Sequence, residues 1–257
     1  MVNENGTWTM YGVSWDDPTC LHTVDEAIAY IEQVGFLPLF SNDIPGFSLE
    51  ERTVPEHWWS GDPEIDPWAW REEIARRGKM AYGKFFDKKA GFISAEWLPA
   101  FVNCRRDGYD FDARWEDGKA PARQKKIMDL FMDDLADEEY YSNDLKQRAG
   151  FGKGGEKGFE GVLAALQMQL YICVRDFRQR VNKQGEPYGW PIAVYATPEH
   201  LWGYEHVTSL YREAPQASAE RIAKHIAEVY PVATDKIIRG CQAPVGSETA
   251  CMPKMHS

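Results

Sequence analysis

The sequence predicts an α+β fold, because stretches with helical periodicity are followed by short strand-like pairs in both halves of the chain. A helix places its apolar residues three and four positions apart, whereas a half-buried strand alternates them. Helical spacing followed by a strand-like pair occurs over residues 23–93 and again over 121–197. Strands joined by tight turns pair in the antiparallel sense, so we expect small antiparallel hairpins or a small sheet.

In the first half, two helices have clear start signals. Thr23 and Glu26 form a capping-box pattern, and Gly35 suits the end of that helix. Asp66 followed by Pro67 predicts a second helix that runs to Gly78. Residues 36–40 are expected to be extended, 80–93 to form a hairpin, 97–102 to belong to a helix, and 107–119 to be a linker or long loop.

The second half predicts three helices and a hairpin between residues 121 and 197. Apolar residues at helical spacing mark the first and third helices, and Ser142 can cap a short one between them. The period then becomes strand-like at 171–174 and 190–195, around the turn-rich tip 182–187. This order is that of a winged helix-turn-helix, which presents its third helix and wing to nucleic acid.

Helical signals resume after residue 197, with Ser218 before a helix that Pro231 ends and a short helix around Ile237 and Ile238. We therefore expect a tandem winged-helix-like arrangement. Its parts are an N-terminal helical and hairpin region with a Trp-rich segment (1–118), a winged helix-turn-helix (119–200) and a C-terminal helical region packed on the rest (201–257).

Composition favours a soluble, cytoplasmic protein. Of the 257 residues, 44% are hydrophobic, which suffices for a folded core. No apolar run approaches the roughly 18 residues of a membrane span, and the polar start is no signal peptide. The five cysteines are scattered without metal-binding spacing, so we expect reduced thiols and no metal site. Oligomeric state is left open.

The net charge of −11 speaks against non-specific coating of DNA. Residues 141–186, however, carry eight Lys or Arg and five acids, so this segment is +3. A locally basic face can still steer toward phosphate. An ordinary surface of mixed charge is the alternative. The candidate nucleic-acid contacts are Lys153, Lys157, Arg175, Arg178, Arg180 and Lys183.

A Trp-rich segment offers a second candidate site. Aromatic faces stack on bases or other flat ligands, and a carboxylate or Arg can fix the orientation of such a ligand. The alternative is that the rings cover a junction in the fold, with Asp66 serving only as a cap. The candidate pocket residues are Trp58, Trp59, Trp68, Trp70 and Arg71, and the neighbouring acid/base candidates are His57, Asp62 and Glu64.

Two further patterns carry less weight. Gly150-x-Gly152-x-x-Gly155 formally matches a dinucleotide fingerprint, but it follows a predicted helix rather than a strand. Gln167 and Gln169 can orient water or read a base edge, or simply end an amphipathic helix. Familiar hydrolase, zinc-protease and NTPase motifs are absent from the sequence, and no cofactor is implied.

The chain resembles the AlkZ-related proteins, relatives of the AlkZ-like winged-helix DNA glycosylases. Three stretches carry the resemblance: Gly155-Glu156-Lys157-Gly158-Phe159-Glu160 with Leu163, Leu166 and Gln167; Tyr188-Gly189-Trp190; and Gly61-Asp62-Pro63-Glu64-x-Asp66-Pro67-Trp68-x-Trp70-Arg71. The resemblance implies tandem winged helices and a role in DNA repair.

The AlkZ-like glycosylases, to which the AlkZ-related proteins are related, position the hydrolytic water with paired glutamines after the first helix. The corresponding stretch here, residues 35–43, contains no glutamine, and Asn42 or Asp43 is the candidate substitute. We therefore expect a DNA-binding or repair-related protein without an evident catalytic motif, with double-stranded DNA or a flat aromatic ligand as partner. The alternatives are a glycosylase-like hydrolase that removes alkylated bases and a small-molecule-binding module with a vestigial DNA-binding surface.

Overall fold

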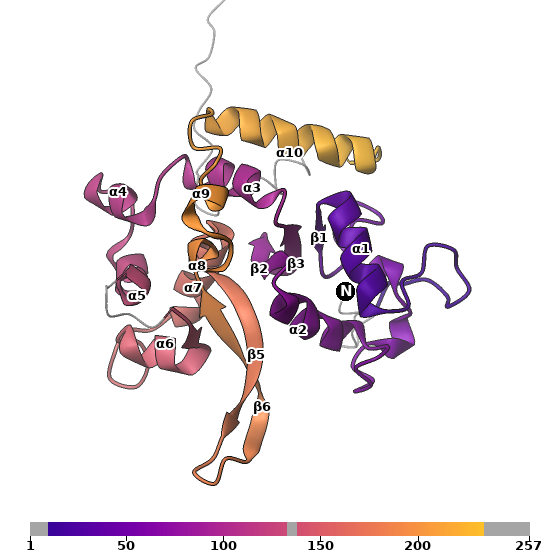
Figure 1. The fold of residues 1–257 in the computed structure, drawn as a ribbon, viewed down its shortest axis with the longest axis horizontal. Coiled ribbons are helices and arrows are strands. Elements are labelled where there is room, and N and C mark those ends of the chain that lie inside the picture. Colours follow the sequence, from indigo (N-terminus) through magenta and orange to yellow (C-terminus); the bar gives the residue numbers. More distant parts are fainter. Residues whose placement is uncertain (1–9, 133–137, 234–257) are drawn as a thin grey trace, which may run out of the picture.

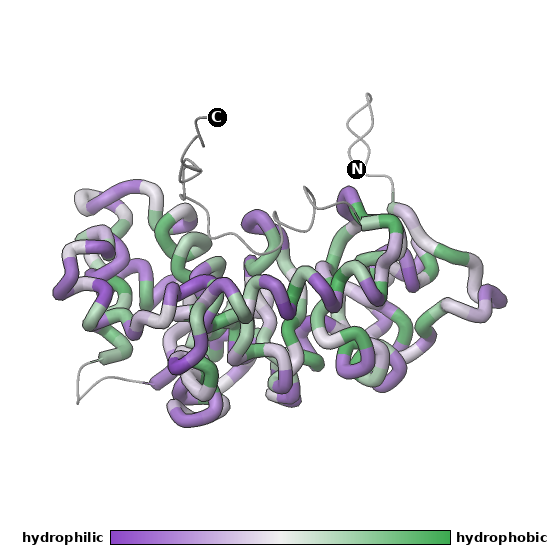
Figure 2. The backbone as a smooth tube through the Cα atoms, turned by 90° about the horizontal axis from the view of Figure 1, so that it is seen from above, coloured by the Kyte–Doolittle hydropathy of each residue, from purple (hydrophilic) through white to green (hydrophobic). Residues whose placement is uncertain are grey.

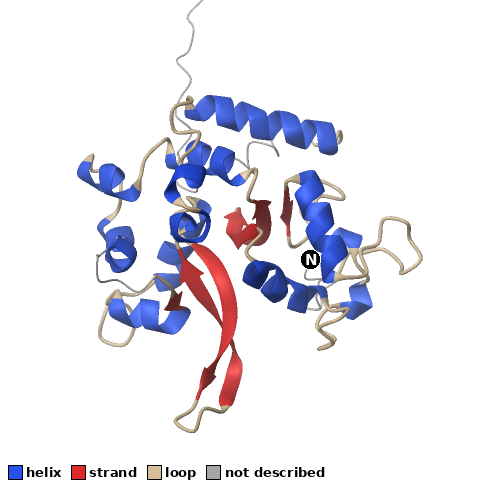
Figure 3. Ribbon diagram, in the orientation of Figure 1, coloured by secondary structure: helices blue, strands red, loops and turns tan. Residues whose placement is uncertain are grey.

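A computed structural model describes residues 10–132 and 138–233. Helices surround a six-stranded antiparallel sheet whose strand order is β1-β3-β2-β5-β6-β4 (Figure 1). The predicted α+β class with antiparallel hairpins is confirmed. Figure 3 shows the longest strands, β5 and β6, extending beyond the helices on one side of the molecule.

The first helix and strand follow the sequence signals. Thr23 caps α1 (Val24–Val34) by accepting a hydrogen bond from the backbone N–H of Glu26, and Gly35 ends the helix at φ +82°. β1 (Phe36–Pro38) begins at once and pairs with β3. The 3₁₀ turns η1 (Glu50–Arg52) and η2 (Pro55–His57) follow in the long connection to α2.

The predicted helix and hairpin after residue 66 are present. Asp66 caps α2 (Pro67–Arg77), and Gly78 ends it in the left-handed conformation. β2 (Met80–Phe86) and β3 (Lys89–Ser94) form the hairpin, and α3 (Leu98–Arg106) follows. The expected linker at 107–119 contains a short helix, α4 (Phe111–Glu116), because Phe111 is buried against Tyr171.

The second half has the predicted order of three helices and a hairpin. α5 (Ala122–Met132), α6 (Ser142–Arg148) and α7 (Phe159–Met168) precede β5 (Cys173–Val181) and β6 (Pro187–Ala196). The short strand β4 (Tyr140–Tyr141) pairs with the far edge of β6. β2 pairs with β5 at Tyr82 and Val174, so one sheet contains strands from both halves.

Three helices follow the sheet: α8 (Pro198–Trp202), α9 (Tyr204–Val207) and α10 (Pro215–Val229), which packs on α3. α10 begins before Ser218, which is buried and accepts a hydrogen bond from Asn103 rather than capping the helix. The helix expected around Ile237 and Ile238 lies outside the described residues.

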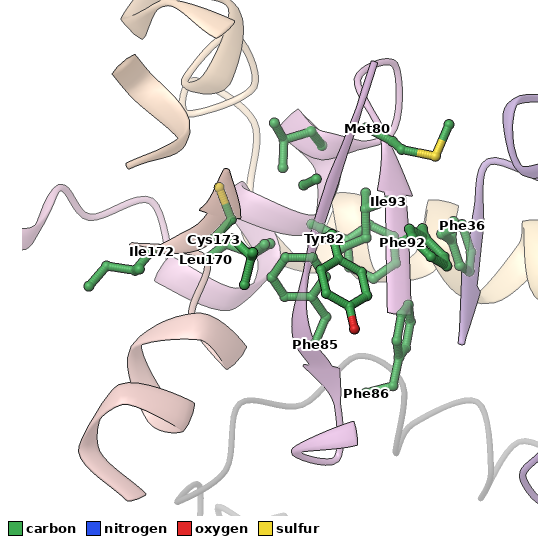
Figure 4. Close-up of a cluster of buried hydrophobic side chains, with 14 of the residues drawn as sticks. Phe36, Met80, Tyr82, Phe85, Phe86, Phe92, Ile93, Leu170, Ile172 and Cys173 are labelled. Carbon is green, nitrogen blue, oxygen red and sulfur yellow. The ribbon is translucent and has the colours of Figure 1, made fainter. Parts of the chain in front are cut away.

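The core is continuous across the sheet. Phe36, Tyr82 and Phe92 lie side by side on β1, β2 and β3, and Leu170 and Cys173 continue the buried cluster at the start of β5 (Figure 4). Hydrophobic residues occur along the whole length of the molecule in Figure 2 rather than at one end. Burial raises the pKa of Tyr82 to about 12.

A buried arginine holds the turn from α7 into β5. Leu170 adopts φ +61°, a left-handed conformation that costs energy for a residue with a Cβ. Its carbonyl accepts a hydrogen bond from Arg106, which also pairs with Glu199 at the start of α8. Arg106 is fully buried, so these bonds compensate its charge and fix the position of the β5 root.

Candidate nucleic-acid interface and ligand cavity

The β5–β6 hairpin has a buried root and an exposed tip. Cys173 and Val174 at the start of β5 and Tyr195 and Ala196 at the end of β6 are buried. The hairpin tip, defined here as residues 180–190, extends past the remainder of the molecule (Figure 1). Because the root packs on α2 and β2, the tip is carried on a fixed base.

The turn in the hairpin tip is ordered by one side chain. The Asn182 carboxamide oxygen accepts hydrogen bonds from the backbone N–H groups of Gln184 and Glu186, each at 2.9 Å. Gly185 adopts φ +83°, which glycine tolerates without strain. A turn held in this way loses little conformational entropy when it binds a partner.

The six predicted basic contacts fall into three places. Arg175 and Arg178 are half-buried on β5 and form ion pairs with Glu139, and Arg178 also pairs with Asp176 at 2.8 Å. Lys153 and Lys157 are exposed on the connection between α6 and α7. Arg180 and Lys183 belong to the hairpin tip, and neither forms an ion pair with another residue in the described ranges.

Two exposed aromatic residues accompany Arg180 and Lys183. Trp190 is 90% exposed and Tyr188 is 49% exposed, and Val181 lies nearby on the opposite strand. Gly189, at φ +72°, separates the two rings and its carbonyl accepts a hydrogen bond from Gln179. Reasoning from the sequence did not select Trp190 as a contact residue, although its place beside a glycine in a predicted wing was an available signal.

The Trp-rich segment is mostly part of the fold. Trp58 and Trp70 are buried, and their indole N–H groups donate to Thr53 and to the carbonyl of Glu64. Asp66 accepts hydrogen bonds from the backbone N–H groups of Trp59, Gly61 and Trp68. Of the four tryptophans, Trp59 is the most accessible, at 50% exposed.

Arg71 is likewise enclosed. Its guanidinium lies 3.8 Å from the ring centre of Trp68 and 4.4 Å from that of Phe177, and it pairs with Glu72. The arrangement joins α2 to β5 through stacked groups. These contacts bring Trp68 and Arg71 together, as predicted for a pocket. The guanidinium, however, covers the ring face of Trp68 on which a flat ligand would stack.

Among the predicted acid/base candidates Asp43, His57, Asp62 and Glu64, Asp43 lines a surface cavity and the other three do not. That cavity measures about 420 Å³ and is lined by Tyr11, Phe40, Ser41, Asn42, Asp43, Pro45, Glu51 and Lys89. His57 lies elsewhere, against the ring of Trp15. Asp62 and Glu64 are exposed on the loop before α2, where Asp62 accepts a hydrogen bond from the N–H of Glu64.

The two glutamines at the end of α7 are buried. Gln167 accepts a hydrogen bond from the N–H of Lys84 and donates one to the carbonyl of Leu163, so its amide joins α7 to β2. The oxygen of Gln169 has no hydrogen-bond partner among the described residues. The two hydrogen bonds of Gln167 thus give this residue a structural role, the attachment of α7 to β2.

Across the described ranges, no group of three or more His, Cys, Asp or Glu residues could hold a metal ion. Within the same ranges, no helix has both the length and the apolar character needed to cross a membrane. The cysteines that the structure describes, Cys20, Cys104 and Cys173, form no disulfide with one another.

Comparison with known proteins gave one family. Searches among curated proteins and among solved structures returned no significant match. The model of the AlkZ-related family matches residues 21–241, a range that includes every helix and strand of the described residues. The chain therefore belongs to the AlkZ-related family.

Proposed function

We propose that this protein binds double-stranded DNA through the hairpin tip, in a function related to DNA repair. Membership of the AlkZ-related family supports the repair context. The observation that carries the proposal is the projecting tip, on which Arg180, Lys183 and the 90%-exposed Trp190 occur together. In this proposal β5 and β6 act as the wing of a winged helix-turn-helix formed with α5, α6 and α7.

The chemistry of the tip suits a duplex. Arg and Lys side chains contact phosphate oxygens and set the position of a protein on DNA. Apolar and aromatic side chains on a narrow ribbon enter a groove or stack on a base. Arg180 and Lys183 meet the first requirement, and Tyr188 and Trp190 meet the second.

The acidic body limits where DNA can bind. The net charge of −11 opposes phosphate binding, and the excess of acids lies in residues 1–66. Arg175 and Arg178 are neutralised by Glu139 and Asp176, so they contribute less to the local positive potential than their number suggests. We therefore expect weak, salt-sensitive binding that depends on few cations.

Fluorescence anisotropy with a short labelled duplex over a salt series tests the proposal. Replacing Arg180 and Lys183 together by Gln should weaken binding and reduce the salt slope by about one for each phosphate that is no longer neutralised. Trp190→Ala should weaken binding by roughly 5- to 150-fold, as expected when about 1–3 kcal/mol of stacking is removed.

Lys88→Gln is the matched control, since Lys88 is an exposed cation on the β2–β3 turn. It should leave affinity and slope close to those of the natural chain. The proposal is wrong if the natural chain does not bind duplex DNA at low salt, or if the Arg180/Lys183 double variant binds as well as the Lys88→Gln control.

A further inference from the structure

The cavity beside Asp43 combines aromatic walls with charged groups. Tyr11 and Phe40 supply rings, Asp43 and Glu51 supply carboxylates, and Lys89 supplies an ammonium group. A volume of about 420 Å³ lies in the range of small-molecule sites. Its lining residues come from the segment before α1, from the connection after β1 and from the start of β3.

Hydrogen bonds fix the loop that carries both carboxylates. The Asn42 side chain donates to the carbonyl of Phe47 and accepts from the N–H of Ile44, which holds the backbone on either side of Asp43. Glu51 accepts hydrogen bonds from the N–H of Gly46 and the hydroxyl of Ser48. The Glu51 carboxylate and the backbone at Asp43 are thus held in place before any ligand arrives, while the Asp43 carboxylate itself stays available to a ligand.

A third carboxylate, that of Glu50, links two parts of the cavity lining. Glu50 is fully buried, and its two oxygens accept hydrogen bonds from the N–H groups of Tyr11 and Ser41, at 2.7 and 2.8 Å. It therefore ties the aromatic wall to the carboxylate-bearing loop. By contrast, none of the hydrogen bonds or ion pairs between described residues engages the exposed Asp43 carboxylate.

The part of the chain that supplies most of the cavity lining is strongly acidic. The N-terminal acidic segment, residues 1–66, contains thirteen Asp or Glu residues and a single Lys or Arg, Arg52. This excess accounts for essentially all of the net charge of −11. A field of this sign attracts small cations and repels phosphate, so the cavity and the hairpin tip favour ligands of opposite charge.

We infer that this cavity binds an amphipathic organic ammonium ion. The apolar part of the ligand lies against Tyr11 and Phe40, and its ammonium group lies at Asp43 and Glu51. Aromatic rings and carboxylates together are the usual surroundings of bound ammonium groups. Lys89, which also lines the cavity, disfavours a second positive charge on the ligand and so selects monocations.

Isothermal titration calorimetry with three probes of similar shape tests this inference: phenethylammonium, the anion 3-phenylpropionate and the zwitterion phenylalanine. Phenethylammonium should bind best. Asp43→Asn should weaken its binding about fivefold to tenfold, because it removes a charged hydrogen-bond acceptor. Lys89→Gln should tighten it about twofold to fivefold, because a like charge is removed.

Asp62→Asn is the matched control, since it removes one exposed carboxylate from the same segment away from the cavity. It should change the affinity for phenethylammonium less than Asp43→Asn does. Circular dichroism spectra of the three variants should superimpose on that of the natural chain, because each changed side chain is exposed.

Three outcomes overturn the inference: no binding of phenethylammonium at millimolar concentration, equal effects of Asp43→Asn and Asp62→Asn, or tighter binding of 3-phenylpropionate or phenylalanine accompanied by weakening in Lys89→Gln. None of these depends on DNA binding by the hairpin tip. Failure of this inference and failure of the proposed function are therefore distinguishable.

Discussion

Tryptophan is used in opposite ways by the Trp-rich segment and the hairpin tip. Trp58 and Trp70 are buried, and their N–H groups donate to partners within the fold. Trp190 is 90% exposed at the end of a projecting ribbon. The difference teaches that clustering in the sequence marks where a core needs large rings, whereas a single ring on an ordered turn can be the better candidate for recognition.

The largest expected effect tests this contrast directly. Trp70→Ala should lower the free energy of unfolding by about 3–5 kcal/mol, because it leaves a cavity and an unpaired carbonyl at Glu64. Trp190→Ala should change it by less than about 0.5 kcal/mol. Urea denaturation of both variants decides the matter, and similar decreases in the two would remove the distinction.

Asp66 tests whether the Trp-rich segment depends on its cap. Asp66→Ala removes the acceptor for three backbone N–H groups, so we expect the unfolding free energy to fall by about 1–2 kcal/mol. Asp66→Asn keeps one side-chain oxygen and should be less destabilising. Equal stability of Asp66→Ala and the natural chain in urea would show that the surrounding packing alone holds the segment.

Tyr82, which pairs with Val174 at the buried root of the β5–β6 hairpin, makes stability depend on pH. Its pKa is raised from 10.0 to about 12 by burial, so the folded state resists deprotonation while the unfolded state does not. This contribution to stability is complete below pH 10 and disappears as the pH rises toward 12. The stability lost through this group amounts to about 1 kcal/mol at pH 11.

Tyr82→Phe should therefore reduce the fall in unfolding free energy between pH 9 and pH 11 by about that amount. Denaturation curves at several pH values in this range measure the change. Other buried tyrosines, among them Tyr171, also have a raised pKa, so a weaker alkaline dependence should persist in the variant. An unchanged pH dependence would contradict the assignment.

The smallest effect concerns the paired cations on β5. Arg178→Gln removes ion pairs with Glu139 and with the buried Asp176. Asp176 keeps its ion pair with Arg76, so the unfolding free energy should fall by only about 1 kcal/mol. Its effect on the DNA salt slope should be smaller than that of Arg180→Gln. A larger effect for Arg178→Gln would place the DNA contact on the strand rather than on the tip.

Local signals predicted the helices well. Thr23, Asp66 and Gly78 mark helix ends by chemistry that involves only neighbouring backbone groups. α4 was missed because Asp110 makes no side-chain cap bond and Phe111 is its only buried residue. The start of α10 was misplaced because Ser218 finds its hydrogen-bond partner in Asn103, far away in the sequence.

The site was harder to predict, because exposure and pairing are properties of the fold. Arg178 and Arg180 look alike in the sequence, but in the fold Arg178 pairs with Glu139 and Asp176 and Arg180 pairs with neither. Similarly, no sequence pattern brings Tyr11, Asp43 and Lys89 to one cavity. Such groupings depend on strand pairings between distant residues, like that of β1 with β3.

The pairing of β2 with β5 at Tyr82 and Val174 has a mechanical consequence. The two hairpins of the sheet each have many ladder bonds, but between them the backbone ladder is narrow. Side-chain contacts therefore do most to fix the orientation of the hairpin tip relative to the β2–β3 hairpin. These contacts are the packing around Tyr82 and the stacking of Arg71. Under a pulling force on the tip, the sheet should part along this seam before either hairpin unzips.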